Sequence, residues 1–203
     1  MISIVDYDVC NLASIENMLK QINFKAKITK NPEEIFKSKL IILPGVGSFD
    51  EGMKNLKKNN LDKVIIEFNK QKKNILGICL GMQLLFKKSE EGELNGLGLL
   101  NGEIKKFDSN KLKVNVPHMG WNYVDINKNS KFFFEHSSKL KFYFAHSYYA
   151  ECKDLNLEAG TTNYGKVFCS IVENSHLFGV QFHPEKSHNY GKSLLKNILK
   201  NVT

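Results

Sequence analysis

The sequence predicts an α/β fold: a mostly parallel central sheet with helices on both faces and a strand-rich second half. In the first half, short apolar runs alternate with stretches whose apolar residues recur at helical spacing, which is typical of parallel strands joined by helices. From residue 103 to residue 182, apolar runs separated by turn residues replace the helical patterns. The 203 residues, of which 42% are hydrophobic, fit one globular domain over residues 1–203.

Turn and capping residues mark the elements of the first half. Asn31, followed by Pro32 and two acidic residues, has the form of a helix start. Ser48 and Glu51 have the spacing of a capping box, in which each side chain bonds a backbone amide near the other. The expected strands are 2–6, 25–29, 40–43 and 74–78, and the expected helices are 12–22, 61–72, 80–86 and those that begin at 31 and 48.

In the second half, two aromatic or apolar runs, 142–145 and 166–172, are expected to be strands. A last helix is expected over 191–200, because aliphatic residues there share one face. Residues 116–122, which hold the only tryptophan, are expected to form a loop. That loop would either pack locally or serve as a partner-binding surface, where aromatic and methionine side chains are enriched.

The charge and its distribution exclude some partners. The 29 basic residues are all lysines, and the net charge is +8. A nucleic-acid-binding protein clusters its basic residues and usually employs arginine for bidentate contacts, whereas these lysines are scattered, so no nucleic-acid partner is expected. No membrane partner is expected either, since no apolar stretch is long enough to span a bilayer. A cytoplasmic location is expected, since no basic segment precedes an apolar run at the N-terminus.

Signals for cofactors and metals are missing. The four cysteines have no spacing typical of zinc ligands and are expected to be reduced thiols. The histidines show no metal-ligand spacing, and His146 is expected to be a core or pocket residue. Residues 96–102 approach a dinucleotide-binding loop, but their third glycine is one position late, and no P-loop is present. The sequence therefore predicts neither a metal nor a cofactor.

A cysteine at a strand–helix junction is the first candidate for catalysis. The apolar strand expected over 74–78 runs into Cys79 and then into a helix, with Gly77 and Gly81 two residues on either side. This is the nucleophile-elbow pattern, in which the glycines permit a sharp turn. The turn would expose Cys79 at the carboxyl edge of the sheet, where a helix N-terminus favours the thiolate. An inert buried cysteine at a strand end is the alternative.

His183 and Glu185 are the second candidate. His183 follows an apolar strand, and in an extended chain a residue two positions further on points to the same side. Glu185 is therefore expected to orient His183, and His183 to act as the base for Cys79. An ordinary turn after a strand is the alternative, because Pro184 favours turns. Together with the cysteine elbow, however, the segment favours catalysis.

Residues 44–49, Pro-Gly-Val-Gly-Ser-Phe, are the third candidate, since they follow a strand and precede a helix. Their two glycines would let backbone amides approach a ligand closely. One of these amides, with that of Leu80, would form an oxyanion hole. Taken alone, the segment fits a plain strand-to-helix turn equally well.

Together these segments resemble class I glutamine amidotransferases, and in particular the glutaminase subunits of imidazole glycerol phosphate synthases. The resemblance covers almost the whole chain and rests on residues 44–49, 77–83, 117–122 and 183–187. It implies hydrolysis of L-glutamine to L-glutamate and ammonia through a cysteine thioester, with no cofactor. It also implies a (β/α)8-barrel cyclase partner in a heterodimer. That partner would use the ammonia to make imidazole glycerol phosphate and an aminoimidazole carboxamide ribotide in histidine biosynthesis.

The resemblance also implies roles for single residues. Cys79 would attack the glutamine amide, His183 would protonate the departing ammonia and then activate water, and Glu185 would orient His183. The oxyanion would be held by the amide of Leu80 and the backbone of Gly45, Val46 and Gly47. Glutamine would be cradled by Gln83, Glu91, Ser147 and Tyr148. The partner would be met by Asn11, Met119, Trp121, Tyr143 and Lys186.

One segment departs from the family's pattern. The family usually has Gly-x-Gly-Asn where this chain has Asp8-Val9-Cys10-Asn11, at a position similar to part of the family's partner-facing edge. A second hypothesis therefore stays open, in which the same glutaminase feeds ammonia to another acceptor enzyme such as a sugar amidotransferase. A thiol peptidase is disfavoured because Gln83 and residues 117–121 would lack a purpose. A non-enzymatic scaffold is disfavoured because all three catalytic candidates are present.

Overall fold

The computed structural model describes residues 1–8, 12–127, 130 and 139–202. Its strands are β1 (Ile2–Val5), β2 (Ala26–Thr29), β3 (Leu40–Leu43), β4 (Asn74–Ile78), β5 (Gly102–Lys106), β6 (His118–Ile126), β7 (Lys139–His146), β8 (Tyr148–Cys152), β9 (Glu158–Asn163), β10 (Val167–Asn174) and β11 (Leu177–Val180). Its helices are α1 (Leu12–Gln21), α2 (Pro32–Phe36), α3 (Phe49–Lys58), α4 (Leu61–Lys70), α5 (Leu80–Leu84), α6 (Ser109–Leu112) and α7 (His188–Val202), with 3₁₀ turns η1 (Leu155–Leu157) and η2 (Pro184–Lys186).

Within the described residues, these strands form one mixed sheet in the order β2-β1-β3-β4-β11-β10-β9-β6-β7, with β5 and β8 joined beside β10. The first five strands in this order pair in parallel, and the other paired strands run antiparallel. The α/β fold with a strand-rich second half is therefore confirmed. Because β4 and β11 are neighbours, the ends of two strands that are distant in sequence meet at one edge.

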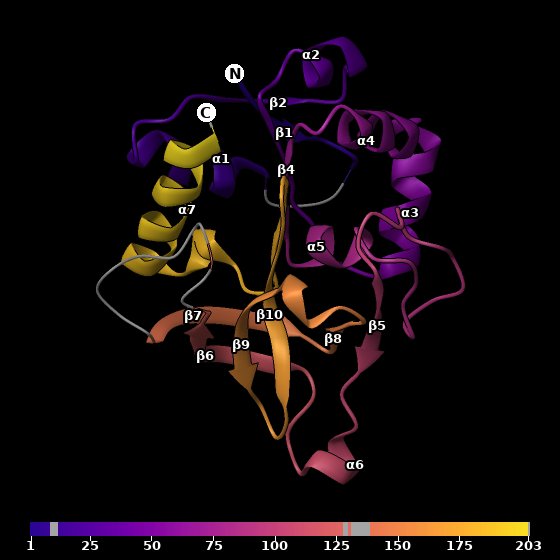
Figure 1. Cartoon of the computed structure of the whole chain (residues 1–203), viewed down its shortest axis with the longest axis vertical. Coiled ribbons are helices and arrows are strands. Elements are labelled where there is room, and N and C mark those ends of the chain that lie inside the picture. Colours follow the sequence, from indigo (N-terminus) through magenta and orange to yellow (C-terminus); the bar gives the residue numbers. More distant parts are fainter. Residues whose placement is uncertain (9–11, 128–129, 131–138, 203) are drawn as a thin grey trace.

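Helices cover both faces of the parallel strands (Figure 1). On one face, α1 and α7 pack against a hydrophobic cluster that includes Leu19, Leu76 and Leu195. On the other face, α3, α4 and α5 pack against a second cluster that includes Phe68 and Ile75. Strands buried on both sides read as continuous apolar runs, which explains why the sequence predicted β3 and β4 correctly.

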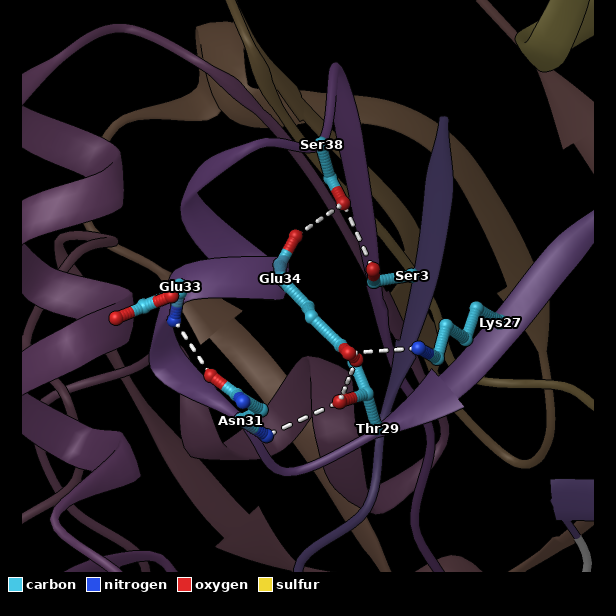
Figure 2. A network of polar contacts seen from close by, with 7 residues as sticks. All are labelled: Ser3, Lys27, Thr29, Asn31, Glu33, Glu34 and Ser38. Atoms are coloured by element: carbon cyan, nitrogen blue, oxygen red, sulfur yellow. Dashed lines mark hydrogen bonds and ion pairs between the residues drawn. The ribbon is translucent and has the colours of Figure 1, made fainter.

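A polar network ties α2 to the edge of the sheet (Figure 2). The carboxylate of Glu34 accepts hydrogen bonds from Lys27 at 2.6 Å and from the hydroxyl of Thr29 at 2.5 Å, both on β2. As the sequence predicted, Asn31 caps the helix, because its side chain accepts the amide of Glu33 at 2.9 Å. These contacts hold the short helix α2 where a five-residue segment would not be stable alone.

The predicted capping box at Ser48 is wrong. Ser48 is the residue before α3, but its side chain makes no capping hydrogen bond. Instead, the carboxylate of Glu91 accepts the amide of Phe49 at 2.8 Å. A carboxylate from a distant segment is favoured at this helix end because it satisfies a free amide and meets the positive end of the helix dipole.

The predicted loop over 116–122 is also wrong in its main part, since residues 118–126 form the strand β6. Met119, Trp121 and Tyr123 alternate along β6 and are 65%, 40% and 56% exposed. An ordinary surface strand carries polar residues on its solvent side. Here large apolar and aromatic residues stand on that side, so the period of two could not be recognised from the sequence.

A search of the described residues for a helix that is long and apolar enough to cross a bilayer finds none.

Candidate active site

Cys79 lies on a tight turn between β4 and α5, as predicted. Its backbone has φ 53° and ψ −111°, a conformation that non-glycine residues rarely adopt and that clusters at functional sites. The flanking positions must be glycines because neighbouring backbone atoms lie too close to leave room for a side chain. A Cβ at Gly77 would lie 2.6 Å from the Cα of Met82, and one at Gly81 would lie 1.8 Å from the carbonyl oxygen of Leu43. The turn therefore fits against its surroundings only when both positions lack a side chain.

The pairing of β4 with β11 brings the second candidate to this turn. Ile78 is opposite Val180, and the amide of Cys79 donates to the carbonyl of Val180 at 2.8 Å. Three residues beyond Val180 stands His183, which is 2% exposed. Between them, the side-chain amide of Gln181 donates to the sulfur of Cys79 at 3.8 Å.

His183 and Glu185 form the expected pair. The Nδ1 of His183 and the Oε1 of Glu185 are 2.8 Å apart, and both side chains are only 3% exposed. The predicted contact is right but the predicted reason is wrong, since Glu185 lies in the 3₁₀ turn η2 and not in an extended chain. Burial opposes a charge on the His183 ring, but hydrogen bonds and attraction to Cys79 and Glu185 outweigh it and raise the pKa of His183 to about 10.

A serine anchors the histidine segment to the sheet. The hydroxyl of Ser187 donates to the carbonyl of His183 at 2.6 Å and accepts the amide of Tyr143 at 3.0 Å. The amide of His183 also donates to the carbonyl of Tyr143 at 2.9 Å. These bonds fix the backbone of His183 relative to β7. Sequence reasoning did not single out Ser187 for this role.

A pocket of about 300 Å³ opens beside the sulfur of Cys79. Each residue that the resemblance assigned to glutamine binding lines it: Gln83, Glu91, Ser147 and Tyr148. Gln83 bridges two walls, because its side-chain nitrogen donates to the carbonyl of Tyr148 at 3.1 Å and to Gln181 at 3.0 Å. Burial is the main cause that raises the pKa of Glu91, against the opposing hydrogen bond from Phe49.

The third candidate segment lies against the elbow. Val46 and Gly47 line the pocket together with Leu80. Gly45 is packed behind them, since a Cβ there would lie 2.9 Å from the Cβ of Leu80. The buried hydroxyl of Tyr7 donates to the carbonyl of Pro44, immediately before Gly45. Burial, and the nearby sulfur of Cys79 to a smaller extent, raise the pKa of Tyr7. Sequence reasoning did not identify Tyr7 as a support for this segment.

Four of the five residues assigned to a partner surface lie at the mouth of the pocket or beside it. Met119 and Lys186 are exposed and line its rim, and the Lys186 ammonium stands 5.9 Å from the centre of the Tyr143 ring. Trp121 is 40% exposed, and its ring stacks on that of His188 at 5.5 Å. Asn11, also assigned to this surface, lies outside the described residues. A protein covering this face would also cover the pocket.

Among the residues that the structure describes, one group of side chains could hold a metal ion. Cys152, Glu158 and Cys169 each offer a ligand atom within 4.8 Å of the others. The three residues stand on β8, β9 and β10, so no spacing along the chain could reveal them. A hydrogen bond with Cys152, and then burial, raise the pKa of the Cys169 thiol, and burial raises the pKa of Glu158. The Cys169 thiol donates to the carbonyl of Ile171 at 3.3 Å, so it has a partner in its protonated form.

A pair of buried histidines was missed by sequence reasoning. His118 and His146 are opposite each other on β6 and β7, and their rings are joined by a hydrogen bond of 2.9 Å. His146 was expected to be either a core or a pocket residue, and it lines the pocket. The pair could not be seen in the sequence, because residues 118–122 were interpreted as a loop and their pairing partner was unknown.

Comparison with known proteins identifies the class. A family model described as glutamine amidotransferase class-I matches residues 3–202. The chain belongs to the class I glutamine amidotransferase family. Imidazole glycerol phosphate synthase subunit HisH 2 of Methanococcus maripaludis is 48% identical to it over 202 residues, which cover 98% of this chain and 99% of that protein. Imidazole glycerol phosphate synthase subunit HisH of Leptospira interrogans is 42% identical over 201 residues, which cover 98% of each.

Solved structures agree in fold. The chain is similar to the structure of PurLQS from Thermotoga maritima, with a TM-score of 0.76 and 21% identity, over 100% of this chain and 98% of that one. A crystal structure of a glutamine amidotransferase matches with a TM-score of 0.77 and 15% identity, over 98% of each chain.

Proposed function

We propose that this chain hydrolyses the side-chain amide of L-glutamine to L-glutamate and ammonia, and that the ammonia passes to a synthase partner. The observation that carries the proposal is the meeting of Cys79, His183 and Glu185 at one edge of the sheet, beside a pocket. The named relatives are subunits of imidazole glycerol phosphate synthase, which supports the cyclase of histidine biosynthesis, a (β/α)8 barrel, as the partner in a heterodimer.

The geometry supports acyl transfer through a thioester. Glu185 accepts the Nδ1 proton of His183, which leaves the Nε2 of the ring for Cys79. Nε2 of His183 takes the thiol proton of Cys79, and the sulfur attacks the amide carbon of glutamine. His183 then gives this proton to the nitrogen as the carbon–nitrogen bond breaks. Ammonia leaves and a thioester remains. His183 then takes a proton from water, the hydroxide displaces the sulfur, and glutamate is released.

The backbone around the elbow would stabilise the oxyanion. The amide of Leu80 begins α5, so the positive end of the helix dipole faces the developing charge. The segment Gly45–Gly47 lies beside it and would supply a second amide. Glutamine would be held by Gln83, Glu91, Ser147 and Tyr148. An ionised Glu91 would attract the α-ammonium of the substrate, because opposite charges attract strongly in a partly buried site.

The pocket mouth explains why a partner would help. Ammonia in water is protonated near neutral pH and stops being a nucleophile, so a covered route between two active sites preserves it. Met119 and Lys186 are on the pocket rim, and Trp121 and Tyr143 extend the same face. A barrel docked here would seal the pocket and receive the ammonia. The family match over residues 3–202 supports one glutaminase domain, which we place in the cytoplasm.

Loss of the nucleophile tests the hydrolysis. We expect Cys79→Ala to abolish glutamate release and to leave binding of the cyclase intact, since Cys79 is only 6% exposed. Cys152→Ala is a matched control, because Cys152 is also a buried cysteine but is not among the pocket-lining residues. Glutamate release by Cys79→Ala at the rate of Cys152→Ala would refute the role of Cys79.

A mixing experiment tests the coupling. The purified chain should release glutamate slowly alone and faster when the cyclase and its ligand are added. An unchanged rate on mixing would contradict ammonia transfer to that partner, while hydrolysis by the isolated chain would still stand.

A second acceptor enzyme remains the alternative for the partner. It is favoured by the departure at Asp8-Val9-Cys10 from the family's glycine-rich pattern. Restored growth of a histidine auxotroph lacking its own glutaminase subunit would support the cyclase. Failure to restore growth, with co-purification of a sugar amidotransferase, would support the alternative.

A further inference from the structure

A chain of hydrogen bonds runs from β6 to the wall of the pocket. The side-chain nitrogen of Asn122 lies 3.1 Å from Nε2 of His118, and Nδ1 of His118 lies 2.9 Å from Nε2 of His146. Nδ1 of His146 then lies 2.7 Å from the carbonyl oxygen of Tyr148. Both histidines are buried, with exposures of 3% and 6%.

The carbonyl of Tyr148 determines which atom donates and which accepts in each of these hydrogen bonds. A carbonyl only accepts, so His146 must carry a proton on Nδ1, and in the neutral ring Nε2 is then an acceptor. His118 must therefore donate from Nδ1, which leaves its Nε2 as an acceptor for Asn122. The amide of Asn122 is held in the matching orientation, because its nitrogen also donates to the carbonyl of Asn163 at 3.1 Å and its oxygen accepts the amide of Tyr123 at 2.8 Å.

The arrangement keeps both rings neutral. A proton added to His118 would point an N–H at the N–H of Asn122, which has no lone pair to accept it. Burial lowers the pKa of His118 to about 4 and that of His146 to about 3. The His118 ring is also held by stacking between Tyr164, at 3.9 Å between ring centres, and Phe144, at 4.6 Å.

The same carbonyl links the histidines to the nucleophile. The oxygen of Tyr148 accepts from Gln83 as well as from His146, Gln83 donates to Gln181, and Gln181 donates to the sulfur of Cys79. The carbonyl of Tyr148 is thus held by two side chains, that of His146 and that of Gln83, and Gln83 connects it to the thiol.

We propose that His118 and His146 are positioning residues, which hold the Tyr148 carbonyl and through Gln83 and Gln181 fix the glutamine pocket and the thiol of Cys79. The predicted effect on kcat/KM rests on the proposed glutaminase function. The histidines act as neutral hydrogen-bond donors and exchange no proton with the substrate. His183 remains the acid and base.

Proton-detected nitrogen NMR of the histidine rings in the wild-type chain tests the arrangement without any assay of function. Both His118 and His146 should be neutral and carry their proton on Nδ1 between pH 6 and 8. A proton on Nε2 of either ring, or a charged ring in this range, would overturn the proposal. Since this measurement needs no turnover, it separates a failure of the proposal from a failure of the glutaminase assignment.

Two substitutions at His118 test the consequence for catalysis in the complex with the cyclase. His118→Phe keeps an aromatic ring between Phe144 and Tyr164 but removes the donor to His146, and it should lower kcat/KM about 10- to 100-fold. His118→Asn places a side-chain N–H near the position of Nδ1 and should recover most of that loss. Equal kcat/KM for His118→Phe and wild type, or no recovery by His118→Asn when both variants fold, would refute the positioning role.

Discussion

Replacing Gly81 by alanine should disrupt the turn that presents Cys79. The added Cβ would lie 1.8 Å from the carbonyl oxygen of Leu43 and 2.6 Å from its carbonyl carbon, whereas real Cβ contacts stay beyond 3.0 Å. Both atoms belong to the backbone at the end of β3, so the turn and the strand must separate by at least about 1.2 Å. Overpacking of this kind costs about 1–3 kcal/mol of stability. A displacement of about 1 Å at a catalytic group lowers the rate about 100-fold.

Denaturant unfolding of the chain and glutamate release in the presence of the cyclase measure the two effects. Gly98→Ala is the matched control, because Gly98 has φ +65° but nothing lies within 4 Å of its added Cβ. It should lose about 1 kcal/mol from backbone strain and keep its rate. Equal rates of glutamine turnover by Gly81→Ala and Gly98→Ala would show that the contact between position 81 and the backbone of Leu43 does not determine the shape of the elbow.

Three further predictions concern the buried polar groups. Glu185→Gln should lower kcat about 1,000-fold or more with little change in partner binding, because the amide cannot stabilise a charged His183, and steady-state kinetics of the complex checks this. The free energy of unfolding should fall as the pH drops below about 6.5, by about 1.4 kcal/mol per pH unit for each of His118 and His146. Their lowered pKa values mean that the unfolded chain binds these protons first, so this stability is full above pH 6.5, and denaturant midpoints at pH 7, 6 and 5 would reveal it. Tyr7→Phe should cost about 1 kcal/mol or more in thermal unfolding at pH 7, because it leaves a buried carbonyl unpaired; an unchanged melting temperature would contradict this.

Much of the fold could be predicted from periodicity because the buried parallel strands have no polar side. β3 and β4 were predicted with the residues that the structure gives them, and β2 and α5 differ by one or two residues at their ends. β6 was missed because its solvent face carries Met119, Trp121 and Tyr123, which removes the alternation of apolar and polar residues. The cap of α3 was assigned to Ser48 because a local pattern cannot show that Glu91, far along the chain, takes its place.

The candidate site was predictable where its residues follow local patterns. Gly77 and Gly81 mark the elbow by their spacing, and Glu185 is close enough to His183 in sequence to be its partner. The supporting residues were not predictable in this way. Tyr7 reaches the segment before Gly45 from the turn that follows β1, and its role depends on a contact that no local pattern encodes.

By itself, the sequence determined which strands and turns form and which side chains can do the chemistry, because backbone preferences and glycine requirements act between neighbours. The tertiary structure decided which of those pieces meet. Pairing of β4 with β11 sets Cys79 beside His183, and pairing of β6 with β7 joins His118 to His146. These contacts depend on the order of strands in the sheet. That order is set by packing of the whole molecule and cannot be inferred from the spacing of residues along the chain.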